Sequence, residues 1–334
     1  MPFILNPTAH LDPKILTDKL EKELQRLGFG EGLVEAAIKD KNIVGLCCDL
    51  TGSTKMDLFR DAYPDRFIEI GVAEQNMISV AAGMALEDKI PFAASYAVFN
   101  PGRSWDQIRI SVCYSRANVK IVGAHAGISV GKDGATHQGL EDIASVRAIP
   151  NLSILAPADY EETKKATLAI AKFKGPVYIR FGRETVPKIT TAKTPFQIGK
   201  AEVFVAGSDV SIIACGPMVF EAIKASQNLY PKIKAEVINC HTIKPLDIET
   251  IIESVKKTGA VVTAEEAQIT GGLGGAIAEI LAENYPCPME RIGVRDTFGE
   301  SGAPDELMDK YCLRAKHIEK AVRQVLSRKR LLPE

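Results

Sequence analysis

Apolar runs and amphipathic stretches alternate along the first half of the chain, starting at Gly30. The short runs are unbroken, which is typical of strands buried on both faces of a sheet. The predicted strands span 43–48, 67–71, 91–96, 119–124, 152–156 and 177–181, and the predicted helices lie near 31–39, 73–86, 103–116 and 160–173. This alternation predicts an α/β fold with a mostly parallel sheet that helices cover on both faces.

A second, smaller α/β unit is predicted after residues 183–199, a stretch rich in Pro and Thr with little periodicity. Its strands are expected at 210–214, 235–239, 260–264 and 290–294, and its helices near 217–228, 247–257, 273–284 and 314–328. We therefore divide the chain into a polar leader with a short amphipathic helix (1–25), a first domain (26–187) and a second domain (195–330).

Composition narrows the functional classes. The chain has 334 residues, 46% hydrophobic and 25% charged, with a net charge of −1, so its charge gives no reason to expect nucleic acid or an anionic membrane as partner. No apolar run reaches membrane length. The seven cysteines are scattered without zinc-ligand spacing, which favours reduced thiols in a cytoplasmic protein.

One carboxylate stands at the start of an apolar helix. Glu74 follows the strand 67–71 and opens the predicted helix 73–86, whose apolar spacing indicates burial on most of its circumference. A carboxylate there gains from the helix dipole, so Glu74 can be a simple helix cap. In apolar surroundings its proton affinity would instead rise, allowing it to hold or share a proton near neutral pH.

The carboxyl ends of the predicted strands carry the other candidate residues, and parallel sheets bind ligands beyond these ends. The segments are DLTGST with Asp49 and Ser53, YAVF with Tyr96 and Phe99, and GRE with Arg183. Residues 123–139 contain five glycines together with His125, Asp133 and His137. Glycines let the backbone approach a ligand, and histidines offer groups that titrate near neutral pH. The alternative is a surface loop with incidental histidines.

A second glycine-rich segment, TGGLGGAIAEI at 270–280, joins a strand to a helix. It departs from the dinucleotide fingerprint, because Ile277 stands at the third glycine position and no acidic residue ends a following strand at the expected distance. We interpret it as a turn and helix start.

The motifs GVAEQNM, SYAVF, GKDGATHQGLED and IPNLSILAPAD, in this order, resemble those of the thiamine-diphosphate enzymes of the transketolase group. The resemblance runs from about Gly30 to the C-terminus. It implies a pyrimidine-binding domain followed by a transketolase C-terminal domain that serves dimerisation. Members of the group hold the diphosphate and its divalent metal through a Gly-Asp-Gly motif, and this sequence contains no GDG triplet.

The resemblance therefore implies the C-terminal subunit of a split transketolase. The N-terminal subunit would carry the GDG motif and hold Mg²⁺ or another divalent cation, and a two-plus-two heterotetramer would form. The implied reaction transfers a two-carbon ketol unit between sugar phosphates with thiamine diphosphate as cofactor. This chain alone would bind the cofactor poorly and be inactive.

The resemblance also implies roles for single residues around the cofactor. Glu74 matches the glutamate that hydrogen-bonds a ring nitrogen of the aminopyrimidine and promotes its imino form. Phe99 matches the ring that stacks on the pyrimidine, and Tyr96 matches a second wall, although both residues can also be core packing. Asp49 would orient the cofactor side of DLTGST, and His137 would lie nearest the cofactor's amino group.

Four further matches concern the substrate. His125, Asp133 and His137 look like contacts to the donor sugar, and Arg183 and Ser53 would hold its phosphate. Two features depart from the family pattern. The region FGEGLVEAA lacks the phosphate-binding arginine that the family carries near the start of this domain. The position that holds the family's third aromatic residue of the pyrimidine pocket falls near Gly102 in this chain.

Three alternatives remain for the chain. Deoxyxylulose-phosphate synthase shares AEQ and the DG-THQG pattern but has Arg in place of His125, and it is normally a single chain. The beta subunit of a 2-oxo acid dehydrogenase is of similar length but lacks a loop like DGATHQ. A non-catalytic scaffold of the same fold is disfavoured by the presence of Glu74, Phe99 and both loop histidines.

Overall fold

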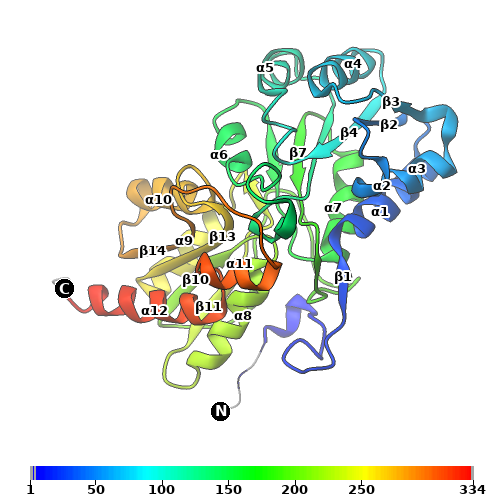
Figure 1. Cartoon of the computed structure of the whole chain (residues 1–334). Helices are drawn as coiled ribbons and strands as arrows, with labels where there is room; N and C mark the ends of the chain where they lie inside the picture. Colours follow the sequence, from blue (N-terminus) through cyan, green and yellow to red (C-terminus); the bar gives the residue numbers. More distant parts are fainter. Residues whose placement is uncertain (1–2, 4, 332–334) are drawn as a thin grey trace.

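The computed structural model describes residue 3 and residues 5–331, which form two α/β units (Figure 1). The first is built on a seven-stranded sheet in the order β12-β6-β7-β5-β4-β2-β3, parallel except for β12. Its strands are β2 (Ile43–Cys47), β3 (Phe67–Glu69), β4 (Ile90–Tyr96), β5 (Lys120–Ala124), β6 (Ser153–Leu155), β7 (Val177–Arg180) and β12 (Thr242–Lys244). The predicted α/β fold with a parallel sheet is confirmed.

Helices cover both faces of this sheet, as predicted (Figure 1). Side chains that alternate along each strand point to opposite faces and enter two separate hydrophobic clusters. One face is covered by α1 (Gln25–Lys39) and α7 (Tyr160–Lys172). The other is covered by α4 (Glu74–Leu86), α6 (Asp142–Arg147) and α5 (Trp105–Gln107), which continues as the π-helix η3 (Ile108–Tyr114).

Two helix predictions need correction. Helix α1 begins at Gln25, earlier than the predicted 31, because its glycines allow close packing on α7. A Cβ at Gly28 would lie 2.3 Å from the carbonyl oxygen of Tyr160. Helix α4 is buried on one face only, since Gln75, Ser79 and Leu86 on its other face are exposed. Part of the apolar surface of α4 is therefore not covered by the rest of this chain.

The second unit holds a five-stranded sheet in the order β14-β13-β10-β11-β9, in which only β9 is antiparallel. All four predicted strands and all four predicted helices are present. The strands are β9 (Glu202–Val205), β10 (Val210–Ala214), β11 (Ala235–Asn239), β13 (Val261–Gln268) and β14 (Met289–Val294). The helices are α8 (Met218–Leu229), α9 (Ile248–Thr258), α10 (Leu273–Asn284), α11 (Pro304–Lys310) and α12 (Ala315–Lys329).

The leader differs from its prediction. In its described part the only helical segment is the 3-10 turn η1 (Pro7–Ala9), so the expected amphipathic helix is wrong. The apolar side chains of Ala9 and Ile15 pack into the core of the second unit instead. The leader ends in β1 (Lys22–Leu24), which pairs antiparallel with β8 (Thr185–Pro187). Tertiary packing here outweighs the local helical pattern.

The remaining segments are short. They are α2 (Thr51–Thr54), α3 (Asp57–Ala62), the 3-10 turn η2 (Pro64–Arg66) and the 3-10 segment η4 (Ile128–Asp133). Among the described residues, no helix combines the length and apolar character needed to cross a membrane.

Candidate active site

Glu74 is the first residue of α4 and is only 3% exposed. Its two carboxylate oxygens accept hydrogen bonds from Nη1 of Arg103, at 3.2 and 3.1 Å, and one also accepts from Oγ of Ser95 at 3.3 Å. Ser95 lies on β4, and Arg103 lies in the turns that follow this strand. The expectation of apolar surroundings is therefore wrong, because the buried carboxylate is paired with a cation.

A wall of flat side chains stands beside Glu74. The rings of Tyr96 and His125 stack with centroids 4.1 Å apart, and Phe99 lies 5.9 Å from Tyr96 and 5.5 Å from His137. The structure thus brings together four residues that the sequence spreads over two loops. Near Gly102, where the family's third aromatic was expected, the guanidinium carbon of Arg103 lies 4.0 Å from the centre of the Phe99 ring.

His125 carries an unused hydrogen-bonding capacity. It is 2% exposed, and both of its ring nitrogens are buried without a hydrogen-bond partner among the described residues. Burial lowers its pKa to about 3, and the positive charges of Arg26 and Arg183 add to the effect. The expectation of a group that titrates near neutral pH is therefore wrong for His125. It is a neutral imidazole, and buried polar atoms without partners are typical of sites that bind a ligand.

The glycine-rich loop is held in a defined shape that presents His137. Gly131 and Gly134 adopt positive φ angles of 81° and 74°, which glycine tolerates best. Nε2 of Gln138 donates to the carbonyl oxygens of Ile128 and Glu300, which ties the loop to the second unit. The half-buried His137 has its Nδ1 2.9 Å from Oγ1 of Thr136.

Two arginines contact loops at the carboxyl ends of the strands. Nη1 of Arg183 donates to Oδ2 of Asp133 at 3.2 Å and to the Val130 carbonyl at 2.9 Å. Nη1 of Arg26 donates to the Ser53 carbonyl at 2.8 Å. Burial lowers the pKa of Arg26, and the positive charge of Arg183 lowers it further.

The sequence analysis considered only FGEGLVEAA for an arginine near the start of this domain and did not consider Arg26, which precedes that stretch. It was overlooked because the helix was predicted to begin at 31. In the structure Arg26 is the second residue of α1, and the fold places it beside DLTGST. An amphipathic pattern interrupted by three glycines conceals the first turn of this helix.

Asp49 stands apart from these contacts. It is exposed and adopts a φ of 57°, while its backbone N–H donates to Oε1 of Glu69 at 2.7 Å. Glu69 also accepts from the Gly71 N–H and from Oγ1 of Thr51, so it fixes the loop that carries Ser53. Asp49 as a cofactor contact stays a prediction.

The cluster fits a flat, nitrogen-containing ring. Glu74 offers a buried carboxylate to a ring nitrogen, Phe99 offers an aromatic face, and His125 offers two unpartnered nitrogens. An aminopyrimidine has both the stacking surface and the hydrogen-bonding edge that such a set requires. Within the described residues, no group of three or more His, Cys, Asp or Glu side chains could hold a metal ion.

The second glycine-rich segment begins helix α10, as predicted. The backbone N–H groups of Leu273 and Gly274 donate to the buried Glu265 carboxylate at 2.7 and 2.8 Å. Burial raises the pKa of Glu265 to about 7. An internal carboxylate therefore occupies the position that a dinucleotide phosphate would need at this helix start.

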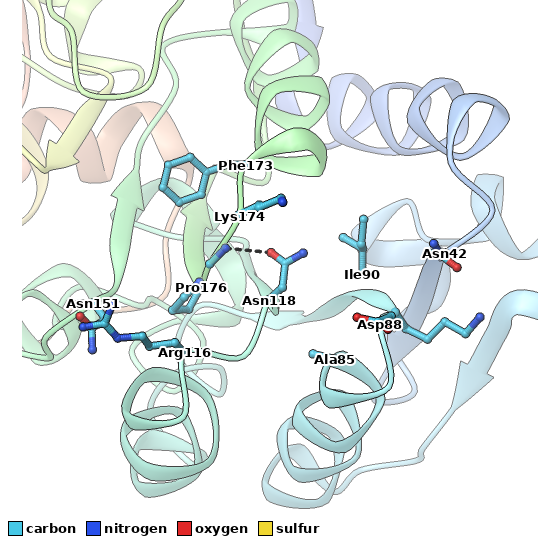
Figure 2. Close-up of a pocket in the computed structure, with 12 residues that line it drawn as sticks. Asn42, Ala85, Asp88, Ile90, Arg116, Asn118, Asn151, Phe173, Lys174 and Pro176 are labelled. Atoms are coloured by element: carbon cyan, nitrogen blue, oxygen red, sulfur yellow. Dashed lines mark hydrogen bonds between the residues drawn. The ribbon is translucent and has the colours of Figure 1, made fainter.

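A cavity of about 820 Å³ lies at the opposite ends of the strands of the same sheet (Figure 2). It is bordered by the amino ends of β4, β5 and β7, and Figure 2 shows Asn118 at its centre accepting from a backbone N–H, that of Gly175. Lys89, Lys174 and Arg116 lie at its border. Because ligands of parallel sheets bind at the carboxyl ends, the histidine-lined region remains the candidate active site.

The comparisons with known proteins agree over nearly the whole chain. Family models for the transketolase pyrimidine-binding domain and the transketolase C-terminal domain match residues 24–188 and 199–318. A putative transketolase C-terminal section from Methanocaldococcus jannaschii is 46% identical, over 91% of this chain and 96% of that one. A 6-deoxy-6-sulfo-D-fructose transketolase subunit from Clostridium sp. is 45% identical, over 93% of this chain and 97% of that one.

The fold has a similarly close match among solved structures. The structure titled split-gene transketolase, inactive beta4 tetramer, superposes with a TM-score of 0.86 at 44% identity. The match covers 92% of this chain and 99% of that chain.

Proposed function

This chain belongs to the transketolase family, and we propose that it is the C-terminal subunit of a two-chain transketolase. The reaction is the transfer of a two-carbon ketol unit from a ketose phosphate to an aldose phosphate, with thiamine diphosphate as cofactor. The observation that carries the proposal is the placement of buried Glu74 beside Phe99, Tyr96 and the two loop histidines.

Each residue of the cluster has a distinct task in this reaction. Thiamine diphosphate supplies a nucleophilic carbon and an electron sink for breaking the bond beside a ketone. Glu74 hydrogen-bonds the ring nitrogen of the aminopyrimidine, and Phe99 stacks on its face. His125 is neutral, so it donates or accepts a hydrogen bond at a substrate oxygen rather than supplying a positive charge. His137, on the rim of the wall, faces the reacting atoms.

The arginine pair supports an anionic substrate. Arg183 and Arg26 hold the terminal phosphate together with Ser53, and Asp133 accepts a hydrogen bond from a substrate hydroxyl. In the structure Arg183 is already paired with Asp133, so the phosphate competes for one of its N–H groups. A sulfonate has the same tetrahedral oxygens, and the relative named for 6-deoxy-6-sulfo-D-fructose makes a sulfonated ketose a second donor to test.

Exposed apolar side chains support a partner subunit. Helices α4 and α5 lie side by side at the top of the first unit (Figure 1). Five exposed large apolar residues lie on or next to α4, α5 and η3: Val72, Leu86, Trp105, Ile110 and Tyr114. Exposed apolar side chains concentrated in one region are typical of an interface. We propose that an N-terminal subunit covers it, contributes the GDG motif and Mg²⁺, and assembles with this chain as a two-plus-two heterotetramer.

Reconstitution tests the proposal. The chain is purified alone and together with a GDG-containing N-terminal transketolase section, and each is assayed with thiamine diphosphate and Mg²⁺ for ketol transfer between sugar phosphates. We expect activity only in the two-chain complex. Pyruvate-dependent condensation in place of ketol transfer would assign the chain to the deoxyxylulose-phosphate synthase type. Cofactor binding without either reaction would favour the scaffold, and full turnover by the chain alone would refute the partner.

A further inference from the structure

Arg103 occupies both contacts that the proposed function assigns to the cofactor's pyrimidine ring. Its Nη1 bonds both oxygens of Glu74, and its guanidinium carbon lies 4.0 Å from the centre of the Phe99 ring. A guanidinium is planar, carries N–H donors on its edge and stacks on aromatic faces. It therefore makes with Glu74 and Phe99 the same kinds of contact that an aminopyrimidine would make.

Glu74 has little acceptor capacity left for a second partner, because Arg103 and Ser95 already donate three hydrogen bonds to a carboxylate with about four acceptor positions. At 3% exposure the carboxylate has little room, and Arg103 already bonds both of its oxygens. A ring nitrogen that approaches Glu74 must compete for these oxygens, and a ring that stacks on the same face of Phe99 must take the place of the guanidinium. A buried carboxylate without a partner is costly, so Arg103 also stabilises Glu74 until another partner arrives.

Arg103 is placed so that it can leave. Its side chain is 48% exposed and extends from the turns after β4, so moving it into solvent breaks few contacts. When Arg103 moves out, water replaces Glu74 as the partner of its guanidinium, and the pyrimidine nitrogen replaces Arg103 at the buried carboxylate, so neither charge is left unpaired. The cost of moving Arg103 still subtracts from the affinity for the cofactor.

We propose that Arg103 is a built-in occupant of the pyrimidine subsite, which thiamine diphosphate must displace to reach Glu74 and Phe99. Arg103 then acts as a gate that protects the buried carboxylate and lowers cofactor affinity. This inference rests on the proposed function, because it takes the pyrimidine to bind at Glu74. The competing possibility is that Arg103 is a permanent wall of the subsite that helps to hold the ring.

The two possibilities predict opposite changes in affinity. Arg103→Met removes the charge and the planar donor edge but keeps a flexible apolar side chain of similar length. The dissociation constant of thiamine diphosphate is measured by calorimetry on the reconstituted two-chain complex with Mg²⁺. If the cofactor must displace Arg103, the Arg103→Met complex should bind thiamine diphosphate about tenfold more tightly than the wild type, because a competing charged hydrogen bond is lost. Arg103→Lys keeps the charge, and its dissociation constant for thiamine diphosphate should lie between those of Arg103→Met and the wild type.

Trp105, the only tryptophan of the chain, lies two residues after Arg103 and provides a fluorescence signal from this segment. Its Nε1 donates to the Ser145 carbonyl at 2.8 Å. With a tryptophan-free partner section, addition of cofactor should change Trp105 fluorescence in the wild type and change it less in Arg103→Met. Arg116→Met is the matched control, because Arg116 is exposed at the opposite edge of the sheet, and it should leave the dissociation constant unchanged.

Unchanged or weaker cofactor binding in Arg103→Met, in a complex whose wild type binds the cofactor, overturns the gate and leaves the proposed function intact. If the wild-type complex binds no cofactor, both ideas fail. A variant complex that does not assemble is replaced by Arg103→Lys and Arg103→Gln, for which the same direction of change is required.

Discussion

The carboxyl and amino ends of the strands in the seven-stranded sheet each bury an ionisable side chain, but the partners of the two side chains differ. At the carboxyl edge, Glu74 is held by one half-exposed arginine that can be exchanged for another partner. At the amino edge, the ammonium group of Lys120 is fully buried and donates to Asn118 Oδ1 and to the carbonyl oxygens of Phe173 and Gly175, at 2.6–2.8 Å. Its three donors are all used.

The difference indicates that unsatisfied donors and acceptors are a better guide to the candidate site than the presence of a cavity. The amino edge has a cavity of about 820 Å³, yet its buried lysine is fully bonded to its own loop. The carboxyl edge has His125 with two unpartnered nitrogens and an exchangeable carboxylate. We therefore expect substitutions at the carboxyl edge to change activity and substitutions at the amino edge to change stability.

The largest effect is expected at Glu74. Glu74→Gln keeps the shape of the side chain but removes the charge and the ability to exchange a proton with the pyrimidine. In the reconstituted complex we expect kcat to fall by about a thousandfold, within the range for loss of acid–base function. The urea-unfolding midpoint serves as the control and should change little. Undiminished ketol transfer would remove Glu74 from the mechanism.

The reverse pattern is expected for Lys120→Met. This change removes three hydrogen bonds and leaves the carbonyl oxygens of Phe173 and Gly175 without the Lys120 donor. Because Asn118 Oδ1 keeps the Gly175 N–H, the free energy of unfolding should fall by about 2 kcal/mol. Urea denaturation followed by circular dichroism measures the loss. The complex that still assembles should keep its kcat and KM. A loss of activity without a loss of stability would contradict our division between the two edges.

A smaller change is expected at the proposed phosphate contact. Arg26→Met should raise the KM for a phosphorylated ketose donor by about tenfold, because one charged hydrogen bond to the phosphate is lost. The KM for the same ketose without phosphate should stay the same. An equal rise for both donors would mean that Arg26 only supports the Ser53 loop.

The pH dependence of stability separates the two edges further. Burial lowers the pKa of Lys120 to about 7, below its value in the unfolded chain. Between pH 7 and about 10 the unfolded state therefore binds the additional proton, and the contribution of Lys120 to stability rises with pH and is lost as pH falls. The slope is about 1 kcal/mol per pH unit. The gap in unfolding free energy between wild type and Lys120→Met should widen accordingly, and a constant gap would refute the lowered pKa.

Local sequence patterns were sufficient to predict most strands and helices and the parallel sheet of the first unit. Unbroken apolar strands and amphipathic helices predicted the parallel sheet and four of the five helices described in the second unit, α11 being the one that was not predicted, because burial on one or both faces leaves a periodic trace in sequence. The order of strand ends also predicted which loops carry Tyr96, Phe99, His125 and His137. Predictions of single elements were wrong where contacts with distant residues determine the structure. One example is the leader, whose apolar residues pack on the second unit instead of forming a helix.

The sequence by itself determined the fold class, the loops of the site and the identity of most candidate residues. Only the tertiary structure decided which of them meet. It paired Glu74 with Arg103, placed Arg26 against the Ser53 carbonyl, and left both nitrogens of His125 without a partner among the described residues. Periodicity records which side of an element is buried, whereas a pairing between distant residues depends on how the elements close around the sheet, and no local pattern encodes that distance.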